Sequence, residues 1–355
     1  MKENKEKVFS TRLLKWNKFD NNRQMPWKGE SNPYLIWLSE IILQQTRVEQ
    51  GLNYFLAFRS KYPLVTDLAN APEDEVMKLW QGLGYYSRAR NLHATAKIIS
   101  TNFDGKFPAN YNDIIALKGI GAYTAAAIAS FAYNAPYAVV DGNVIRIISR
   151  VFGIETPFDT TEGKKQFAKL AQELLPVETP AEYNQAIMDF GATVCTPAQP
   201  KCLECPLQSI CFAYEKGLIP LLPVRSKKLV KKERFFTYFL IREGGNVFIQ
   251  KRTAKDIWAN LYELPLFESE APVEQGFKEL MKQVFGIDAI SINDYSKEYK
   301  QMLTHQKLHI RFVQEEISPK EGNKLTAYQK VNETALADFA FPRTITLYLK
   351  ENSLI

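Results

Sequence analysis

The cysteines of this 355-residue chain are gathered in one place, and this constrains the fold around them more than any other feature. All four lie within residues 195–211, in the segment CTPAQPKCLECPLQSIC, with the spacing C-x6-C-x2-C-x5-C. Small secreted domains scatter their cysteines as disulfides, and unrelated buried cysteines have no reason to share one segment. The spacing therefore indicates a metal site that a compact loop surrounds.

The spacing alone does not decide which metal such a loop would hold. Structural zinc sites usually pair two C-x2-C steps across a longer spacer, and this segment has one such step. Thiolate ligation suits either zinc or a [4Fe-4S] cluster. The pattern therefore favours iron-sulfur and leaves zinc open.

Composition places the cysteine segment in a globular chain. Hydrophobic residues make up 46% of the sequence, which is enough for a core without disulfides. The N-terminus MKENKEKVFS lacks the apolar region of a signal peptide, and no apolar run is long enough to cross a bilayer. We expect a soluble, cytoplasmic protein with no membrane partner. Its net charge of +6 mildly favours a polyanionic partner.

Hydrophobic periodicity divides the chain into two domains. Helical patterns fill residues 1–216, a stretch rich in proline and basic residues predicts a linker over 217–234, and strand-like alternation around one helix predicts a small α+β domain over 235–355. The helices expected in most detail are 33–46 after the N-cap Asn32, 72–81, 162–175 after Thr160 or Thr161, and 180–192. In the second domain we expect strands at 235–243, 246–252, 261–268 and 307–316, and the helix at 273–286.

Two turns in the helical region contain a Gly-x-Gly sequence. In LKGIGAYTA, Gly119 and Gly121 would leave backbone N–H groups bare at the start of a helix, which suits a phosphate, although an ordinary helical turn is the simpler interpretation. In QGLGYYSRARNL, Tyr85 and Tyr86 stand beside arginines, as in wedges that enter a base stack, but either could be a core residue. Both turns are candidate DNA contacts.

Two carboxylates have contrasting sequence surroundings. Asp141 in AVVDGNVIR precedes a helix, where it is a favoured N-cap and where its charged form is stabilised. Glu40 has apolar neighbours one helical turn away, so it is either an exposed residue at the rim of an apolar face or a buried acid that keeps its proton. A neutral acid and a charged carboxylate together suit cleavage of a glycosidic bond.

These segments together resemble the helix-hairpin-helix DNA glycosylases of the endonuclease III superfamily, and within it the adenine DNA glycosylases. The resemblance rests on LKGIGAYTA, VVDGNVIR and the cysteine spacing, with SEIILQQTRV, GLGYYSRARNL and NQAIMDFGATVC, and it covers essentially the whole chain. It implies a multidomain protein with an all-α helix-hairpin-helix glycosylase domain, a [4Fe-4S] cluster loop and a C-terminal α+β Nudix-like domain. It also implies base excision repair by a monomer on duplex DNA that holds adenine opposite 8-oxoguanine or guanine.

The resemblance assigns roles to the catalytic residues. Glu40 protonates the adenine and assists water attack, Asp141 stabilises the cation at C1′, Asn143 orients Asp141, and Tyr123 lines the same site. Further positions follow by the same correspondence: cluster ligands Cys195, Cys202, Cys205 and Cys211; DNA contacts Gln45, Tyr85, Lys118, Gly119 and Gly121; a base pocket of Met25, Trp27 and Gln185; and 8-oxoguanine recognition by Gln45, Leu303, Thr304 and His305.

The chain departs from its relatives at informative places. Bifunctional members carry lysine where this hairpin has Tyr123, so we expect a monofunctional hydrolase, with Lys118 as a possible substitute amine. Leu and Arg are common in the family where this chain has Met25 and Lys28, and Phe-Ser-His is common where it has 303–305, in which His305 could be an ordinary surface histidine.

Three other functions stay open at this stage. A non-catalytic DNA-binding or redox protein could use the same cysteine loop and hairpin. A nucleotide hydrolase would need the acidic signature that the C-terminal domain lacks around 273–286. A bifunctional pyrimidine glycosylase is disfavoured by Tyr123 and by the extra domain.

Overall fold

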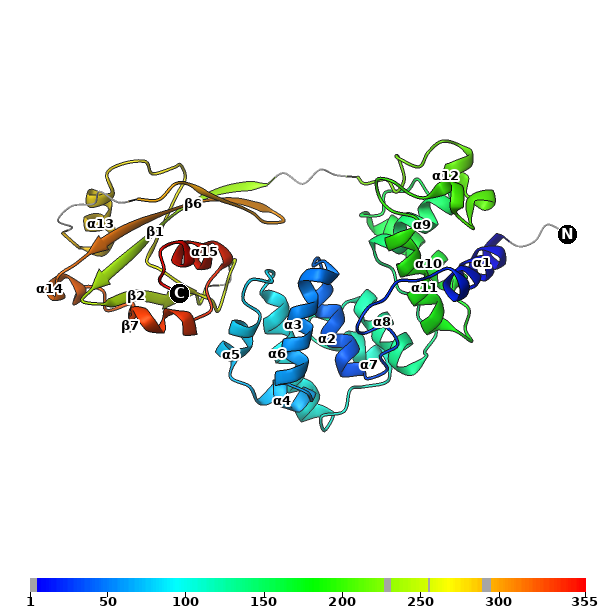
Figure 1. Ribbon diagram of the computed structural model, residues 1–355, viewed down its shortest axis with the longest axis horizontal. Coiled ribbons are helices and arrows are strands. Elements are labelled where there is room, and N and C mark those ends of the chain that lie inside the picture. The colour runs from blue at the N-terminus through cyan, green and yellow to red at the C-terminus, as the bar shows by residue number, and fades with distance from the viewer. Residues whose placement is uncertain (1–4, 227–230, 255, 289–294) are drawn as a thin grey trace. The chain divides into compact units, whose positions relative to one another are not determined.

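The computed structural model of the protein describes residues 5–226, 231–254, 256–288 and 295–355 (Figure 1). The chain forms two compact units, one made by residues 1–70 with 91–227 and the other by 71–90 with 228–355. No helix in these described ranges is both long enough and apolar enough to span a bilayer. The domain boundaries expected from the sequence stay a prediction, and residues 227–230 of the expected linker lie outside the described residues.

The first unit is helical, as the periodicity predicts. Its helices are α1 Lys5–Phe19, α2 Pro33–Leu43, α3 Val48–Lys61, α4 Val65–Asn70, most of α6 Ser87–Asn102, α7 Tyr111–Ala116, α8 Ala122–Tyr133, α9 Gly142–Phe152, α10 Thr161–Leu174, α11 Pro180–Thr193 and α12 Phe212–Glu215. The strands of the described residues begin at Lys232. That start lies inside the range expected for the linker.

Local capping sets the ends of these helices. The Asn32 side chain accepts a hydrogen bond from the Tyr34 N–H at the start of α2, and Thr160 caps α10 in the same way. At its other end, α2 stops at Leu43, three residues earlier than predicted. The chain leaves the helix there because Gln45 adopts a left-handed backbone conformation, with φ of 56°.

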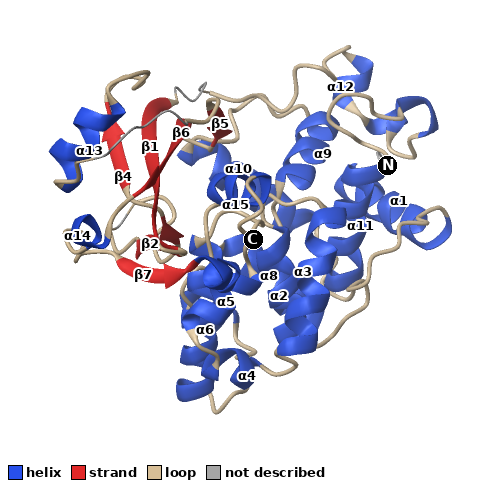
Figure 2. Cartoon of the chain, turned by 60° about the vertical axis from the view of Figure 1, so that its left-hand side comes forward, coloured by secondary structure: helices blue, strands red, loops and turns tan. Residues whose placement is uncertain are grey.

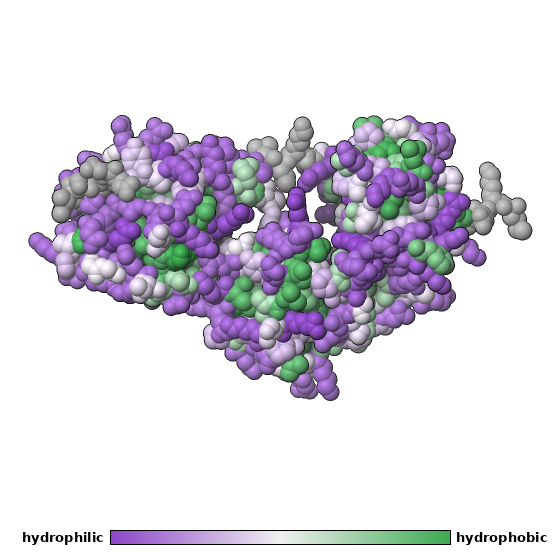
Figure 3. Space-filling model, viewed as in Figure 1, coloured by the Kyte–Doolittle hydropathy of each residue, from purple (hydrophilic) through white to green (hydrophobic). Residues whose placement is uncertain are grey.

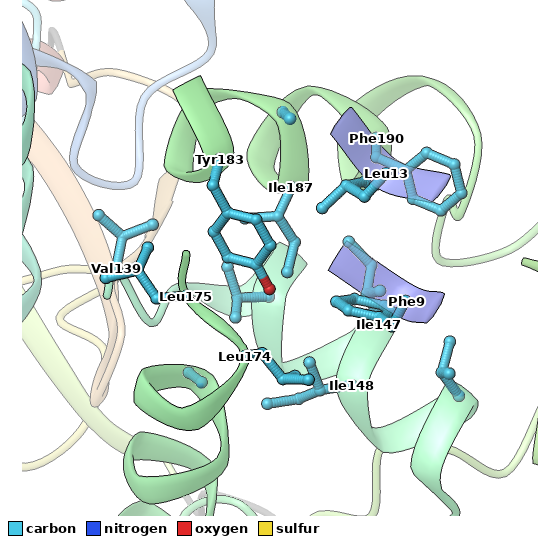
Figure 4. Packing of buried hydrophobic residues seen from close by; sticks show 14 of the residues in the cluster. Phe9, Leu13, Val139, Ile147, Ile148, Leu174, Leu175, Tyr183, Ile187 and Phe190 are labelled. Carbon is cyan, nitrogen blue, oxygen red and sulfur yellow. The ribbon is translucent and has the colours of Figure 1, made fainter. Parts of the chain in front are cut away.

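A shared core holds α1, α8, α9, α10 and α11 together. Figure 4 shows Phe9 and Leu13 of α1 beside Ile147 of α9 and Phe190 of α11, all fully or almost fully buried. Close packing of this kind leaves little freedom to the helix ends that emerge from it. The N-terminus of α9, which carries Asp141, is therefore fixed by the core behind it.

The hairpin between α7 and α8 requires one of its glycines. Gly119 has φ of +78°, and a Cβ atom at this position would lie 2.6 Å from the Cβ of Asn91 on α6. The Thr95 hydroxyl of α6 also donates to the Lys118 carbonyl at 2.7 Å. Residues 117–121 are thus held against α6 in a tight turn.

The second unit is built on a mixed sheet, in which β1 Lys232–Glu243 pairs in parallel with β6 Gln306–Glu316 (Figure 2). The strand order is β3-β2-β1-β6-β5, with β4 paired to β1 and β7 to β2. The remaining elements are β2 Asn246–Lys251, β3 Tyr262–Glu263, β4 Leu266–Ser269, β5 Tyr299–Met302, β7 Gln329–Asn332, α5 Glu73–Leu79, α13 Phe277–Phe285, α14 Pro319–Gly322 and α15 Arg343–Glu351.

Three expectations for this unit need correction. The strand expected at 261–268 is divided into β3 and β4, because the chain changes partner from β2 to β1 on either side of Pro265. The helix expected from residue 273 begins at Phe277, because Gly276 is left-handed and serves as its N-cap. The unit also contains α14 and α15 where a single helix was expected.

Polar side chains dominate the one face of the molecule that Figure 3 displays. The face shown in Figure 3 is mostly hydrophilic, with hydrophobic residues in smaller groups.

Candidate active site and cysteine loop

The helical unit contains a cavity of about 750 Å³. The loop between α1 and α2, α2 itself, and the N-terminal parts of α8, α9 and α11 contribute its lining. It gathers residues that the sequence analysis predicted for both the chemistry and the base pocket: Met25, Trp27, Glu40, Gln45, Tyr123, Asp141, Asn143 and Gln185. Lys118, Gly119 and Gly121 are exposed on the hairpin, outside this lining.

Glu40 lies in the last turn of α2, half-buried at the cavity wall. Its neighbours Ile36 and Trp37 are buried, so the carboxyl group is poorly solvated. Burial raises the pKa of Glu40 to about 7; a hydrogen bond with Tyr123 acts against this rise, and the charge of Asp141 adds to it. A substantial share of Glu40 therefore keeps its proton at neutral pH.

Asp141 occupies the N-cap of α9, which is the structural role that its sequence context favoured, and it also lines the cavity. Its Oδ1 accepts a hydrogen bond from the Val144 N–H at 2.8 Å, and its Oδ2 accepts one from Asn143 Nδ2 at 2.7 Å. Both bonds stabilise the charged carboxylate. Capping and chemistry are thus compatible roles for this residue.

Behind Asn143 stands a residue that the sequence analysis missed. The buried guanidinium of Arg146 donates to Asn143 Oδ1 at 2.8 Å, to the Gly191 carbonyl at 2.7 Å and to the Cys195 carbonyl at 2.7 Å. Glycine at position 191 lets α11 lie close to Asn143, because a Cβ atom at this position would lie 2.5 Å from the Cβ of Asn143. The available signal was an arginine with apolar residues on both sides of it, Ile145 and Ile147, in the helix VIRIISRVF.

A second missed residue, Asp189 of α11, organises the other side of the cavity. Its carboxylate is fully buried and accepts four hydrogen bonds, from Asn21 at 2.9 Å, Arg23 at 2.8 Å, Lys28 at 3.0 Å and Gln185 at 3.0 Å. Three of these donors belong to the loop between α1 and α2, which carries Met25 and Trp27. Asp189 therefore anchors that loop to α11.

The two residues predicted to intercalate share an uncommon backbone geometry. Gln45 in the helical unit and Tyr85 in the second unit both have positive φ, 56° and 47°, which non-glycine residues adopt rarely. Both side chains are exposed, whereas the neighbouring Tyr86 is buried. The structure thus separates the two tyrosines that the sequence could not distinguish.

The turn predicted to recognise 8-oxoguanine joins β5 to β6. Leu303 and Thr304 are half-buried and His305 is exposed. The Thr304 hydroxyl lies 3.0 Å from the Tyr85 hydroxyl, within the second unit. The predicted wedge and the predicted recognition turn are therefore in direct contact.

The four cysteines lie, half-buried and unpaired by disulfides, in the loop that follows α11. The environment of the sulfurs suits thiolates bound to a metal group: the backbone N–H of Leu207 donates to Cys205, and those of Ala213 and Tyr214 donate to Cys211. Burial raises the pKa of Cys205 to about 12, so metal binding at this site would have to displace a proton.

Arg150 supplies positive charge to this loop. Its buried guanidinium lies 3.5 Å from Cys195 Sγ and donates to the carbonyls of Thr196, Pro197 and Leu222. Among the described residues, no carboxylate pairs with Arg150. A buried guanidinium without a carboxylate is costly unless another negative group is near. Cysteine thiolates holding an anionic cluster are such a group. Nevertheless, no group of three or more His, Cys, Asp or Glu side chains in the described ranges is arranged to hold a single metal ion.

Comparison with known proteins gives consistent matches. The family model described as HhH-GPD superfamily base excision DNA repair protein matches residues 38–176, and a NUDIX domain model matches residues 237–351. The chain is 32% identical to the adenine DNA glycosylase of Buchnera aphidicola subsp. Baizongia pistaciae over 96% of this chain and 93% of that protein. It is 40% identical to the adenine DNA glycosylase of Homo sapiens over 59% of this chain and 40% of that protein.

Solved structures share the helical fold. A thermostable thymine-DNA glycosylase superposes with a TM-score of 0.56 and 32% sequence identity, covering 60% of this chain and 97% of that one. Endonuclease III from a non-covalent DNA complex superposes with a TM-score of 0.53 over 61% of this chain and 98% of that one. At 21% identity, the second likeness speaks for the fold alone.

Proposed function

Since this chain belongs to the adenine DNA glycosylases of base excision repair, we propose that it hydrolyses the N-glycosidic bond of adenine opposite 8-oxoguanine or guanine in duplex DNA, and that it leaves the strand uncut. One observation carries the proposed chemistry. Glu40 and Asp141 face one cavity; burial raises the pKa of Glu40, whereas Asp141 accepts hydrogen bonds from Asn143 and from the Val144 N–H. Glycosidic cleavage needs that combination.

The proposed reaction begins with adenine outside the base stack, since its glycosidic bond is inaccessible within the duplex. Protonated Glu40 donates its proton to a ring nitrogen of the adenine, which makes the base a better leaving group. As the bond to C1′ breaks, positive charge develops on the sugar, and ionised Asp141 stabilises it. Glu40, now ionised, accepts a proton from the water that attacks C1′. Asn143 holds Asp141 in position through its 2.7 Å hydrogen bond.

The contacts of the available amines support hydrolysis without strand cleavage. A lyase step needs a free amine to attack C1′, and Tyr123 offers a hydroxyl at the position where bifunctional relatives carry lysine. Lys28, a lysine that lines the cavity, has its ammonium group held by Asp189 and by the Arg23 carbonyl, each at 3.0 Å. Lys118 is exposed on the hairpin.

Recognition of the opposite base is proposed for the second unit and Gln45. The hydroxyls of Tyr85 and Thr304 are in contact, so a base beside the Tyr85 ring would meet the turn 303–305. Thr304 and His305 can supply polar contacts to the oxidised edge of 8-oxoguanine. Leu303 provides an apolar surface where many relatives have an aromatic ring.

We further propose that Cys195, Cys202, Cys205 and Cys211 hold a [4Fe-4S] cluster. The N–H donors to the sulfurs and the uncompensated charge of Arg150 fit an anionic cluster. The cluster would fold residues 195–211 into a rigid loop. The hydrogen bonds of Arg146 connect this loop to Asn143 and so to Asp141.

A single-turnover assay tests the function. The purified protein is mixed with duplexes that hold adenine opposite 8-oxoguanine or guanine, and strand scission is scored before and after alkali. We expect adenine release, nicks only after alkali, and loss of release in Asp141→Asn. Scission before alkali, with a borohydride-trapped adduct lost in Lys118→Ala, would contradict the monofunctional proposal. Binding of the duplex without adenine release would instead favour a non-catalytic DNA-binding protein.

A further inference from the structure

The buried carboxylate of Asp189 has no place in the proposed chemistry, yet its contacts reach the cavity. Each of its oxygens accepts two hydrogen bonds: Oδ1 from Arg23 and Gln185, and Oδ2 from Asn21 and Lys28. A carboxylate has about four acceptor sites and no hydrogen to donate when ionised. All of its acceptor capacity is therefore used by these four donors.

This saturation fixes the orientation of one side chain that lines the cavity. Gln185 lies one helical turn before Asp189 on α11, and the group facing the carboxylate must be the amide nitrogen, because the amide oxygen would be repelled. The Gln185 carbonyl oxygen must then point away from Asp189. Within the described residues, no protein donor is bonded to this oxygen.

We infer that Asp189 makes Gln185 present a hydrogen-bond acceptor to the cavity, so that the site selects a purine carrying a 6-amino group. An amino group donates to such an acceptor, whereas a 6-oxo group would face it oxygen to oxygen. Asp189 is thus a positioning residue for specificity, acting through Gln185. This inference rests on the proposed function, because it concerns which base that cavity accepts.

The same network explains why a carboxylate is needed. The ammonium group of Lys28 and the guanidinium of Arg23 stand beside Gln185 at the cavity, with side chains about a quarter exposed. Without Asp189, the Arg23 guanidinium would lose its carboxylate partner and the Lys28 ammonium would keep only its bond to the Arg23 carbonyl, so both could turn toward an acceptor at Gln185. Asp189 binds both, at 3.0 and 2.8 Å, and so keeps the acceptor available for the base.

The test uses two duplexes that differ only in the target base, adenine or unsubstituted purine, each opposite 8-oxoguanine. Asp189→Asn keeps the size of the side chain but replaces one acceptor by a donor, so that Gln185 can turn its oxygen inward. We expect the single-turnover rate for adenine to fall roughly tenfold more than the rate for purine, since one buried hydrogen bond is lost only with adenine. Equal losses on the two substrates would overturn the inference and leave Asp189 with a structural role alone.

Two further variants separate specificity from folding. Gln185→Met removes the acceptor, so adding Asp189→Asn to it should change the ratio of the two rates no further. Asn21→Ala removes another donor to Asp189, from a residue outside the cavity lining, and should leave the ratio unchanged. A further change of the ratio in the double variant, or an equal change in Asn21→Ala, would contradict the inference.

The same assay distinguishes failure of the proposed function from failure of the inference about Asp189. If the unmodified protein releases no adenine, the function itself is wrong, whereas release with equal losses in Asp189→Asn overturns only the role of Asp189. Thermal unfolding and the visible absorption of each variant, compared with the unmodified protein, show that the fold and any bound iron-sulfur group are retained.

Discussion

Two walls of the cavity, α2 and the start of α9, each carry one carboxyl group. The surroundings of the two groups differ: Glu40 on α2 is poorly solvated, whereas Asp141 at the start of α9 is hydrogen-bonded. Glu40 stands in the last turn of its helix, where backbone N–H groups are already used, and burial raises its pKa to about 7. Asp141 stands at the N-terminal end of its helix and accepts two hydrogen bonds. A helix N-terminus thus supplies Asp141 with a backbone donor that Glu40 lacks, while burial favours the protonated form of Glu40.

The two walls also differ in what supports them. The α2 wall rests on apolar packing, with Ile36 and Trp37 buried beside Glu40. The α9 wall rests on a polar chain from Asn143 through Arg146 to the Cys195 carbonyl. Substitutions on the first wall should act through pKa, and substitutions on the second through geometry.

Removing the acid from the α2 wall should give the largest effect. In Glu40→Gln, no proton is available for the leaving base, so single-turnover adenine release should fall about a thousandfold or more. The variant should nevertheless fold. Residual activity above one tenth of the unmodified rate would mean that Glu40 is not the acid.

The same variant makes a prediction about stability. Folded Glu40 holds its proton up to about pH 7, whereas the unfolded chain releases it near 4.5, so this group costs stability as pH rises between those values. Glu40→Gln should therefore match the unmodified protein at pH 4.5 and exceed it by about 1–2 kcal/mol at pH 8, after allowance for partial exposure. Denaturant unfolding at the two pH values would check this.

Breaking the polar chain of the α9 wall should have the next largest effect. Arg146→Met leaves Asn143 and two carbonyls without their donor, so Asp141 should lose its fixed position. We expect adenine release to fall about tenfold to a hundredfold, with only a small change in its pH dependence, because burial is the main cause of the raised pKa of Glu40 and stays as it is. A large shift of the pH profile would show that Arg146 acts on Glu40 as well as on the geometry of Asp141.

Crowding the same wall should act more mildly. Gly191→Ala places a methyl carbon 2.5 Å from the Asn143 Cβ, closer than two such carbons can approach, so Asn143 or the adjoining helix must shift. We expect about 1–3 kcal/mol of lost stability and a fall in rate of roughly tenfold or less. Ala192→Gly, at an exposed neighbouring position, is the matched control for helix propensity, and its rate should not change.

The smallest effect is expected when the hydroxyl group of Tyr123 is removed. The hydrogen bond from Tyr123 lowers the pKa of Glu40, so Tyr123→Phe should raise it further. Because the acid form is active, the loss of rate at alkaline pH should move to higher pH, by about one unit or less. A pH–rate profile that moved to lower pH would contradict the arrangement described here.

Local sequence patterns were sufficient to predict those features that depend on residues close by in the sequence. Asn32 could be recognised as an N-cap and Asp141 as a residue at the start of a helix, because each depends on the next few residues. The left-handed conformation of Gln45 and the division of the strand around Pro265 could not be read in this way. Both follow from contacts with distant segments.

The same distinction holds within the site. Glu40 and Asp141 could be proposed from their own surroundings. Arg146 and Asp189 each have a partner within one helical turn, but their other partners lie 45 to 168 residues away. A buried charge within an apolar helix is visible in the sequence, yet its counterpart is not. The supporting residues of the two walls therefore became apparent only from the structure.

The position of Arg146 and Arg150 on α9 has a consequence for the timing of assembly. Apart from Gly142 and Asn143, every group that accepts a hydrogen bond from these two guanidiniums lies beyond residue 190. During synthesis, α9 is complete well before the ribosome reaches the cysteine loop. Arg146 and Arg150 therefore lack most of their hydrogen-bond acceptors until that loop has been made. The hydrogen bonds that support Asn143, and through it Asp141, would thus be completed among the last events of folding, so an unfinished chain would lack the proposed activity.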